Sequence, residues 1–230
     1  MEHFRLEQVA DDAWAAIAAP AAGAATNAGF IRVGDATIVF DTFSSTAAGG
    51  ELRLAAEAIA PVAYAINSHW HTDHVNGNRS FADVAIVATE RTRELMEERT
   101  TGEPNVVFPT AVFDERLERD GGVVETLGGG HTECDAFLWF EDTVFAGDLV
   151  VIESHPWVGD GDVEHWLEIL DAFEARRPRV IVPGHGPVGS VEDIPPLRRY
   201  LEGLLDGTAT AVDGWDFAEG HPRNVEALGL

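Results

Sequence analysis

One short segment of this sequence carries most of the chemistry that the chain can perform. It reads His69-Trp70-His71-Thr72-Asp73-His74 and follows directly on an apolar run. Neutral imidazole and carboxylate are the protein ligands that zinc, iron and manganese prefer. The chain has nine histidines in 230 residues, so a chance His-x-His-x-Asp-His is rare, on the order of one chain in a thousand. The segment therefore indicates a metal site rather than a set of solvated loop histidines.

Three further ligand candidates follow other apolar runs. His131 comes after three glycines, Asp148 comes after Gly147, and His185 stands in Pro183-Gly184-His185-Gly186-Pro187. Glycine and proline at these places predict tight loops at strand ends. Taken singly, each residue has an ordinary alternative, as a loop histidine or a turn carboxylate. Together with the first segment they form a consistent set of seven: His69, His71, Asp73, His74, His131, Asp148 and His185.

Alternating strands and helices must position these residues. Hydrophobic periodicity predicts strands over 4–9, 13–18, 29–33, 37–40, 62–67 and 84–88, with helices over 51–60 and 89–99. In the second half it predicts strands over 111–118, 123–127, 136–141, 144–146 and 179–182, with helices over 162–175 and 191–205. Two halves, each rich in strands and then helical, predict an α/β fold of two stacked sheets with helices outside. A cleft at their facing edges would let loops converge on a ligand.

Composition narrows the class of protein. A length of 230 residues, without a low-complexity linker or repeat, predicts a single domain over 1–230. The net charge of −25, from 40 acidic and 15 basic side chains, argues against nucleic acid and anionic membrane surfaces as partners. No apolar run approaches the roughly 20 residues of a membrane-spanning helix. The start of the chain lacks the pattern of a secretory signal, so we expect a cytoplasmic protein. The oligomeric state is not predicted.

Every basic side chain in the acidic sequence is arginine, and the chain has no lysine. Adaptation to high salt and a GC-rich genome would each produce this bias, and composition does not decide between them.

The motifs resemble those of the metallo-β-lactamase fold superfamily. The resemblance covers most of the chain, through Asn27-Ala28-Gly29, Phe40-Asp41-Thr42, the histidine segment, Gly130-His131-Thr132, Gly147-Asp148 and Pro183-Gly184-His185-Gly186. It implies a four-layer αβ/βα sandwich with metals at the sheet edge. By this resemblance, His69, His71 and His131 hold one metal, Asp73, His74 and His185 hold the second, and Asp148 bridges both. Asp41 is then a buried carboxylate that supports the loop, not a ligand.

The resemblance implies a dinuclear zinc-dependent hydrolase acting on a small molecule. Two Zn²⁺ per chain would fit the seven ligands, and iron or manganese would suit the same donors. We expect metal-bound hydroxide to cleave an ester, thioester, lactone or amide, with a β-lactam among the candidates. Asp73 is assigned a catalytic role, in which it orients the nucleophile or returns a proton to the leaving group. No serine or cysteine nucleophile is needed, and we expect Cys134 to be a buried or pocket-wall thiol rather than a ligand.

Several alternatives stay open at this point. A mononuclear iron oxygenase similar to the persulfide dioxygenases, or a redox module, would use the same scaffold, and a metal-binding protein without catalysis is a third reading. Persulfide dioxygenases keep only the first metal, whereas this chain retains both His74 and His185. The most similar zinc β-lactamases usually carry cysteine where this chain has Asp148, which argues against antibiotic hydrolysis. The chain shows no obvious basic patch late in the sequence for the thioesterase that acts on glutathione conjugates.

Substrate contacts are expected from aromatic and histidine side chains on loops beside the metals. By position these are Trp70, His155 and Trp157, with Phe43 and Pro156 as weaker candidates. An aromatic on such a loop is as often structural as it is substrate-binding.

Overall fold

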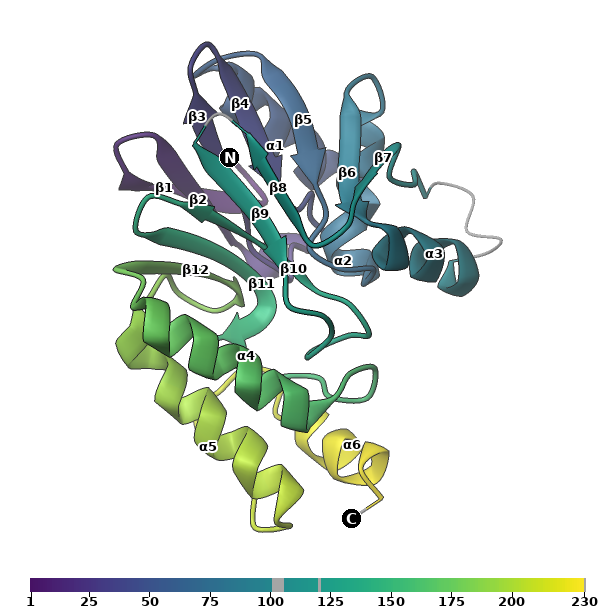
Figure 1. Ribbon diagram of the computed structural model, residues 1–230, viewed down its shortest axis with the longest axis vertical. Helices are drawn as coiled ribbons and strands as arrows, with labels where there is room; N and C mark the ends of the chain where they lie inside the picture. The colour runs from purple at the N-terminus through teal and green to yellow at the C-terminus, as the bar shows by residue number, and fades with distance from the viewer. Residues whose placement is uncertain (101–105, 120, 230) are drawn as a thin grey trace.

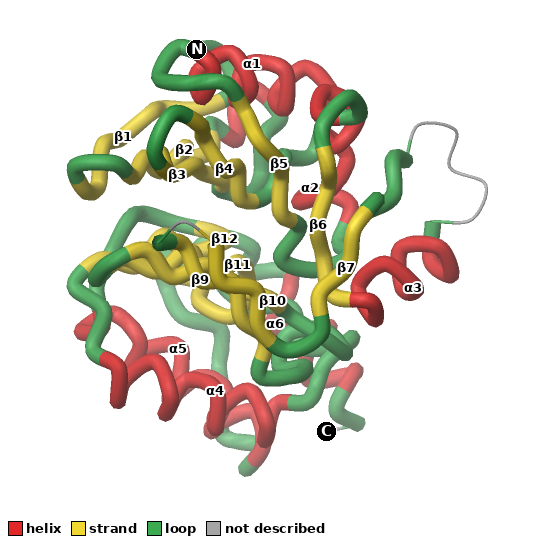
Figure 2. The backbone as a smooth tube through the Cα atoms, turned by 45° about the horizontal axis from the view of Figure 1, so that its top comes forward, coloured by secondary structure: helices red, strands yellow, loops and turns green. Residues whose placement is uncertain are grey.

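Two β-sheets stack face to face, and helices cover their outer sides. The computed structural model describes residues 1–100, 106–119 and 121–229 (Figure 1). The first sheet has the strand order β1-β2-β3-β4-β5-β6-β7, and the second has the order β12-β11-β10-β9-β8. Figure 2 shows α4 and α5 on the outer side of the second sheet and α1 on the outer side of the first. The predicted four-layer αβ/βα sandwich is confirmed.

The strands of the first sheet are β1 (Phe4–Ala10), β2 (Ala13–Ala18), β3 (Ala28–Val33), β4 (Ala36–Phe40), β5 (Val62–Ile66), β6 (Ala85–Thr89) and β7 (Ala111–Phe113). Those of the second are β8 (Arg116–Arg119), β9 (Gly122–Thr126), β10 (Ala136–Phe140), β11 (Thr143–Val151) and β12 (Val180–His185). The α-helices are α1 (Thr46–Glu57), α2 (Thr72–Val75), α3 (Glu90–Arg99), α4 (Val163–Arg176), α5 (Ile194–Leu205) and α6 (Gly220–Ala227). Short 3₁₀ turns are η1 (Pro20–Ala22), η2 (Asn76–Phe81) and η3 (Val191–Asp193).

The inner faces of the two sheets form one apolar layer. Ile31, Ile38 and Ile66 from the first sheet meet Leu138 and Phe145 from the second, and all five side chains are buried. The outer faces pack beneath the helices, with Leu52 of α1 on one side. Trp166 and Phe173 of α4 lie on the other side. Burying apolar area on both faces of each sheet is the main stabilisation of such a layered fold.

Parallel pairing at the ends of the two sheets directs the site residues to one edge. Strands β4 to β7 run parallel to one another, and β12 runs parallel to β11. The carboxyl end of β5 leads into the segment that begins at His69, and β12 ends at His185. Side chains that follow these strand ends therefore meet where the sheets face each other.

Three predicted strands differ from the structure by more than one residue at an end. The predicted strand over 179–182 continues as β12 to His185, so His185 lies at the end of the strand rather than on a loop after it. The predicted strand over 111–118 is two strands in different sheets, because β7 pairs with β6 whereas β8 pairs with β9. The predicted strand over 144–146 continues to Val151, with an irregular register around Gly147. Asp148 therefore lies inside β11, where we expected a strand-end loop, because the apolar residues after it are buried and β11 pairs with β12 again at Val151.

The helix predicted over 51–60 begins earlier, at Thr46, and ends at Glu57. Ser45 caps it, since its side chain accepts a hydrogen bond from the backbone N–H of Ala48. Gly49 lowers the helical propensity of this first part, but a side chain there would not fit: a Cβ would lie 2.8 Å from the carbonyl oxygen of Gly77. Close packing against η2 therefore outweighs local propensity.

The C-terminal helix α6 and the short helix α2 were not predicted. None of the helices in the described part of the chain has the length and apolar character that a membrane crossing requires.

Candidate metal centre

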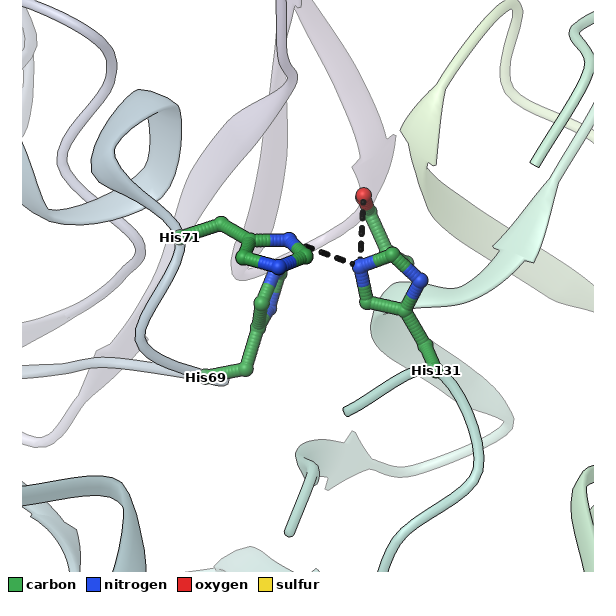
Figure 3. Close-up of side chains that lie close together, drawn as sticks. His69, His71 and His131 are labelled. Atoms are coloured by element: carbon green, nitrogen blue, oxygen red, sulfur yellow. Dashed lines mark hydrogen bonds and ion pairs between the residues drawn. The ribbon is translucent and has the colours of Figure 1, made fainter. Parts of the chain in front are cut away.

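Seven side chains that are far apart in the sequence converge at the edge between the sheets. They form two groups: His69, His71, His131 and Asp148, and then Asp73, His74 and His185. Within each group, one ligand atom from every residue lies within 4.8 Å of the others. Figure 3 shows the imidazoles of His69 and His71 on one side of the first group and that of His131 facing them from the other sheet. All seven predicted ligands are thus brought together.

Hydrogen bonds fix the histidines of the first group in one orientation. The Ser68 hydroxyl donates to Asp41, so its oxygen accepts the Nδ1–H of His69 at 2.8 Å. The Nδ1–H of His131 donates to the carbonyl of Trp157 at 3.0 Å. Their free Nε2 atoms then point into the cluster. Metal-binding histidines are usually oriented in this way, by a hydrogen bond from the ring nitrogen that does not bind the metal.

His71 has the opposite orientation. Its Nε2 lies 3.2 Å from a carboxylate oxygen of Asp160, and its Nδ1 lies 2.9 Å from Nε2 of His131. The three imidazoles of the first group therefore present three nitrogens to one point.

The second group is held in the same way. The Nδ1–H of His74 donates to Asp41 at 2.8 Å, and that of His185 donates to the carbonyl of Ala25 at 2.9 Å. Asp73 is partly exposed, and its carboxylate lies 3.8 Å from Nε2 of His185. Each buried imidazole thus has one nitrogen bound by the protein and one turned toward the centre.

Asp148 lies between the two groups. Its Oδ2 is 3.3 Å from Nε2 of both His131 and His185, and its Oδ1 is 3.1 Å from Nε2 of His74. Gly184 makes room for this carboxylate, because a Cβ at that position would lie 1.8 Å from Oδ1. One carboxylate therefore contacts histidines from both groups.

Three atoms at this centre are buried without a hydrogen-bond partner among the described residues. They are Nε2 of His69, Nε2 of His74 and Oδ1 of Asp148. His74 Nε2 and Asp148 Oδ1 are close, but their geometry does not make a hydrogen bond. Buried polar atoms are nearly always paired in folded proteins, and unpaired imidazole nitrogens beside a carboxylate are what a metal ion would satisfy. The residues present therefore fit a metal centre.

Electrostatics keeps His69, His131 and Asp148 in the forms that bind metals, whereas it favours a proton on His74 that a metal ion would displace. Burial lowers the pKa of His69 and lowers that of His131 to about 3, which keeps both imidazoles neutral. Burial opposes ionisation of Asp148, but His185, His74 and His131 outweigh it and hold its pKa well below the usual range. Burial also opposes protonation of His74, yet Asp148 and Asp41 raise its pKa well above the usual value. Ionised carboxylates and neutral imidazoles are the protonation states of metal ligands.

Two supporting carboxylates were not found from the sequence. Asp135 is buried and accepts hydrogen bonds from the backbone N–H groups of Gly130 and Thr132, so it shapes the loop that carries His131. Its spacing in Gly130-His131-Thr132-x-x-Asp135 is a local signal that could have shown it. Asp160 beside His71 has no such signal, because 89 positions separate the two. The hydrogen bond from His71 lowers the pKa of Asp160 to about 2.

A cavity opens beside the cluster, and only some of the expected substrate contacts line it. Besides residues of the cluster, the walls of this cavity include Val151, His155, Pro156, Trp157, Phe217, Glu219, Gly220 and Arg223. The ring of His155 is fully engaged, since Nδ1–H donates to the carbonyl of Asp216 and Nε2 accepts from the N–H of Val212. It therefore supports the wall more than it offers a polar contact to a ligand.

The remaining candidates lie elsewhere. The Trp70 ring packs against His71, with Arg99 on its face, and does not line the described cavity. Phe43 is buried against Phe4. Cys134 is buried, and its thiol lies 3.3 Å from the hydroxyl of Thr89, outside both ligand groups.

Fold and site together define a class: a two-sheet αβ/βα sandwich with a His/Asp metal centre at the sheet edge. The sequence model of the metallo-beta-lactamase superfamily matches residues 22–185, and the chain belongs to that family. A curated relative, metallo-beta-lactamase type 2 of Bacteroides fragilis, is 28% identical over 161 residues, which are 65% of this chain and 64% of that protein. The chain thus spans less than two thirds of that relative.

Solved structures show the same fold. A metallo-beta-lactamase from Hirschia baltica superposes with a TM-score of 0.73 at 20% identity, covering 91% of this chain and 100% of the other. The structure of VMB-1 gives a TM-score of 0.77 at 20% identity, covering 89% and 99%.

Proposed function

We propose that this protein is a dinuclear zinc-dependent hydrolase that cleaves an ester, thioester, lactone or amide of a small molecule. The observation that carries the proposal is the position of Asp148, whose carboxylate lies within 3.3 Å of histidine nitrogens from both groups. A mononuclear centre would need no carboxylate shared in this way. Membership of the metallo-beta-lactamase superfamily supports the same reaction class.

The residues of the site would have two roles, metal binding and proton transfer. His69, His71 and His131 would hold one ion, Asp73, His74 and His185 the other, and Asp148 both. Two divalent ions in these positions supply an activated water and polarise the carbonyl under attack.

Asp73 is the ligand candidate best placed for proton transfer. Both Asp73 and Asp148 line the cavity, but Asp73 is partly exposed whereas Asp148 is buried. The carboxylate of Asp73 can hold the proton that the attacking water loses and return it to the leaving group. Once bound to the ions, neutral imidazole ligands would leave the two metals electrophilic.

The test measures metal content and activity on one preparation. We expect two zinc ions per chain, and hydrolysis of at least one member of a panel of esters, thioesters, lactones, amides and β-lactams. Activity should disappear with a chelator and return with zinc. A single iron per chain together with oxygen uptake would instead support the oxygenase alternative. Iron or manganese in both positions would change the identity of the metal but not the reaction class. The cytoplasmic location of the protein stays a prediction.

A further inference from the structure

One side chain of the C-terminal helix α6 is both polar and fully buried. Asn224 is buried, whereas the other residues of α6 are partly or fully exposed. A primary amide in such a place costs free energy unless its donors and its acceptor are paired. The partners of this amide therefore show which parts of the fold it holds together.

The amide of Asn224 pairs with the backbone on both sides of Trp157. Its Nδ2–H donates to the carbonyl of Pro156 at 2.6 Å, and its Oδ1 accepts the N–H of Val158 at 3.3 Å. Residues 155–158 have no regular secondary structure. The two bonds therefore take the place of those that a neighbouring strand would supply to this segment, and they require a side chain with both a donor and an acceptor.

The segment 156–158 in turn holds two histidines of the first group. The carbonyl of Trp157 accepts the Nδ1–H of His131 at 3.0 Å. The indole N–H of Trp157 donates to Asp160 at 2.6 Å, and the same carboxylate oxygen lies 3.2 Å from Nε2 of His71. Both hydrogen-bonded paths that start at Asn224 therefore end at ligand candidates of one metal site.

The histidines of the second group are held by other parts of the chain. His74 donates to Asp41 at the end of β4, and His185 donates to the carbonyl of Ala25 before β3. Neither bond involves the segment 156–158. A displacement of this segment would therefore leave both of these imidazoles in place.

Helix α6 gives Asn224 a fixed base. Val225 and Leu228 pack against the apolar core between the second sheet and its helices. Nδ2 of Asn224 also donates to the hydroxyl of Tyr200 on α5 at 3.3 Å, and that hydroxyl lies 2.9 Å from Nδ1 of His221. The amide is thus paired at its oxygen and at both of its hydrogens, which fixes the direction in which it points.

We propose that Asn224 is a positioning residue of the first metal site. It holds the segment 156–158 so that His131 and His71 present their nitrogens to one point, and it does so from a helix that follows the part of the chain matched by the family. The proposal rests on the proposed function in one respect, namely that the first group binds zinc. It requires no particular substrate.

The variant Asn224→Ala removes both bonds to the segment. We expect it to weaken zinc binding at the first group by about tenfold, the lower end of the range for residues that support metal ligands, and to change binding at the second group by less than about twofold. Two backgrounds separate the ions, because His185→Ala lacks a ligand candidate of the second group and His71→Ala lacks one of the first. Competition with a chromogenic chelator measures the zinc affinity of each background with and without Asn224→Ala.

Tyr200→Phe is the matched control. It removes a buried hydroxyl that contacts Asn224 but leaves both bonds from Asn224 to the segment. We expect a lower melting temperature of the metal-free protein and an unchanged zinc affinity. Co²⁺ in place of zinc adds a spectroscopic readout, since its visible absorption depends on the geometry of its ligands. In the His185→Ala background, Asn224→Ala should change that spectrum and Tyr200→Phe should not.

A measurement on wild type decides the matter if Asn224→Ala does not fold. Coupling between two sites is reciprocal, so an ion that needs α6 in place must itself stabilise the docking of α6. Elements near a chain end open locally more readily than the core does. We therefore expect zinc to slow hydrogen exchange over residues 220–227 by about tenfold, and to slow it less over α1, which does not contact the segment.

Three outcomes would overturn the proposal. Equal loss of zinc affinity in both backgrounds would show that Asn224 acts only through the stability of the fold. Unchanged affinity of the first group would show that the segment does not need this residue, and exchange in α6 that does not respond to zinc would show that the two are not coupled. Failure of the proposed function would look different: wild type would hydrolyse nothing in the panel, while zinc binding at the first group still depended on Asn224.

Discussion

At the scale of single residues, each imidazole of the centre is oriented by a partner that is itself fixed. His69 donates to a serine hydroxyl, His131 and His185 donate to backbone carbonyls, and His74 donates to a buried carboxylate. An imidazole with one nitrogen occupied offers the other in a single direction. The division into two groups follows from these orientations, and it can be tested by removing one histidine at a time.

His71→Ala and His185→Ala should deplete different ions, because His71 belongs to the first group and His185 to the second. We expect each variant to lose one zinc per chain and at least about 100-fold in activity, since changes to mere supporting residues already cost 10–100-fold. Plasma mass spectrometry after dialysis measures the zinc content. His3→Ala, which alters a histidine outside both groups, is the control. Equal, unchanged stoichiometry in both variants would contradict the seven-ligand assignment.

Asp148→Asn should reduce activity by at least about 100-fold, because a neutral amide replaces the negative charge that two dications share. The second zinc should also bind more weakly. Zinc titration and turnover on one preparation check both effects. Full activity with two bound zinc ions would show that the shared carboxylate is not needed.

The effect of this variant on folding needs its own measurement. Asp148 is buried inside β11, and its carboxylate is the ionic partner of His74 in the metal-free protein. We therefore expect the metal-free variant to melt at a lower temperature than metal-free wild type. That loss must be separated from the loss of turnover by comparing thermal unfolding of the two proteins.

At the scale of elements, the sequence predicts strands better than it predicts where they end. Strand β2 has the predicted bounds, because Pro20 ends the continuous apolar run that forms it. The convergence of the seven ligand candidates was predictable because each follows an apolar run, whether the structure continues the strand there or not. Asp148 shows the limit of this prediction. Gly147 predicts the end of a strand, yet the buried residues that follow continue the strand to Val151.

The parts that were not predicted depend on contacts between distant segments. Asp160 meets His71 across 89 positions, and Asn224 meets Val158 across 66 positions. Neither has a local pattern, because its role is defined only when the sheets and the C-terminal segment come together.

Asp41, at the end of β4, links two elements and gives a prediction at this scale. Its carboxylate accepts hydrogen bonds from the Ser68 N–H, the Ser68 hydroxyl and the His74 Nδ1–H, each at 2.8 Å. In Asp41→Asn an amide N–H₂ must face one of these donors, whichever way the amide turns. If it faces His74, the imidazole proton must move to Nε2, the nitrogen that would bind the second metal.

We therefore expect Asp41→Asn to weaken binding of one zinc ion by about 10–100-fold. Competition with a chromogenic chelator measures the two affinities. Asp12→Asn is the control, because Asp12 pairs with Arg32 on the surface away from the cluster. Unchanged affinity for both ions would mean that Asp41 does not orient His74.

At the scale of the whole molecule, charge is the dominant feature. Forty acidic side chains against 15 arginines leave a net charge of −25. Surface ion pairs such as those of Arg91 and Arg116 offset part of the repulsion, although exposed pairs of this kind contribute little individually. Salt therefore has two opposite effects on stability. Screening the repulsion between acidic side chains stabilises the fold, whereas screening the ion pairs destabilises it.

Because the acidic residues far outnumber their partners, relief of repulsion should outweigh the loss of ion pairs. We expect the melting temperature to rise by roughly 5 °C between 0.1 and 2 M potassium chloride, corresponding to about 1–2 kcal/mol for a chain of this size. Scanning calorimetry across the salt series measures it, and a series in sucrose separates screening from a general effect of cosolutes. A rise with salt beyond that in sucrose would favour adaptation to high salt as the origin of the acidic, lysine-free composition. A flat response would favour base composition, since the molecule would then gain nothing from screening.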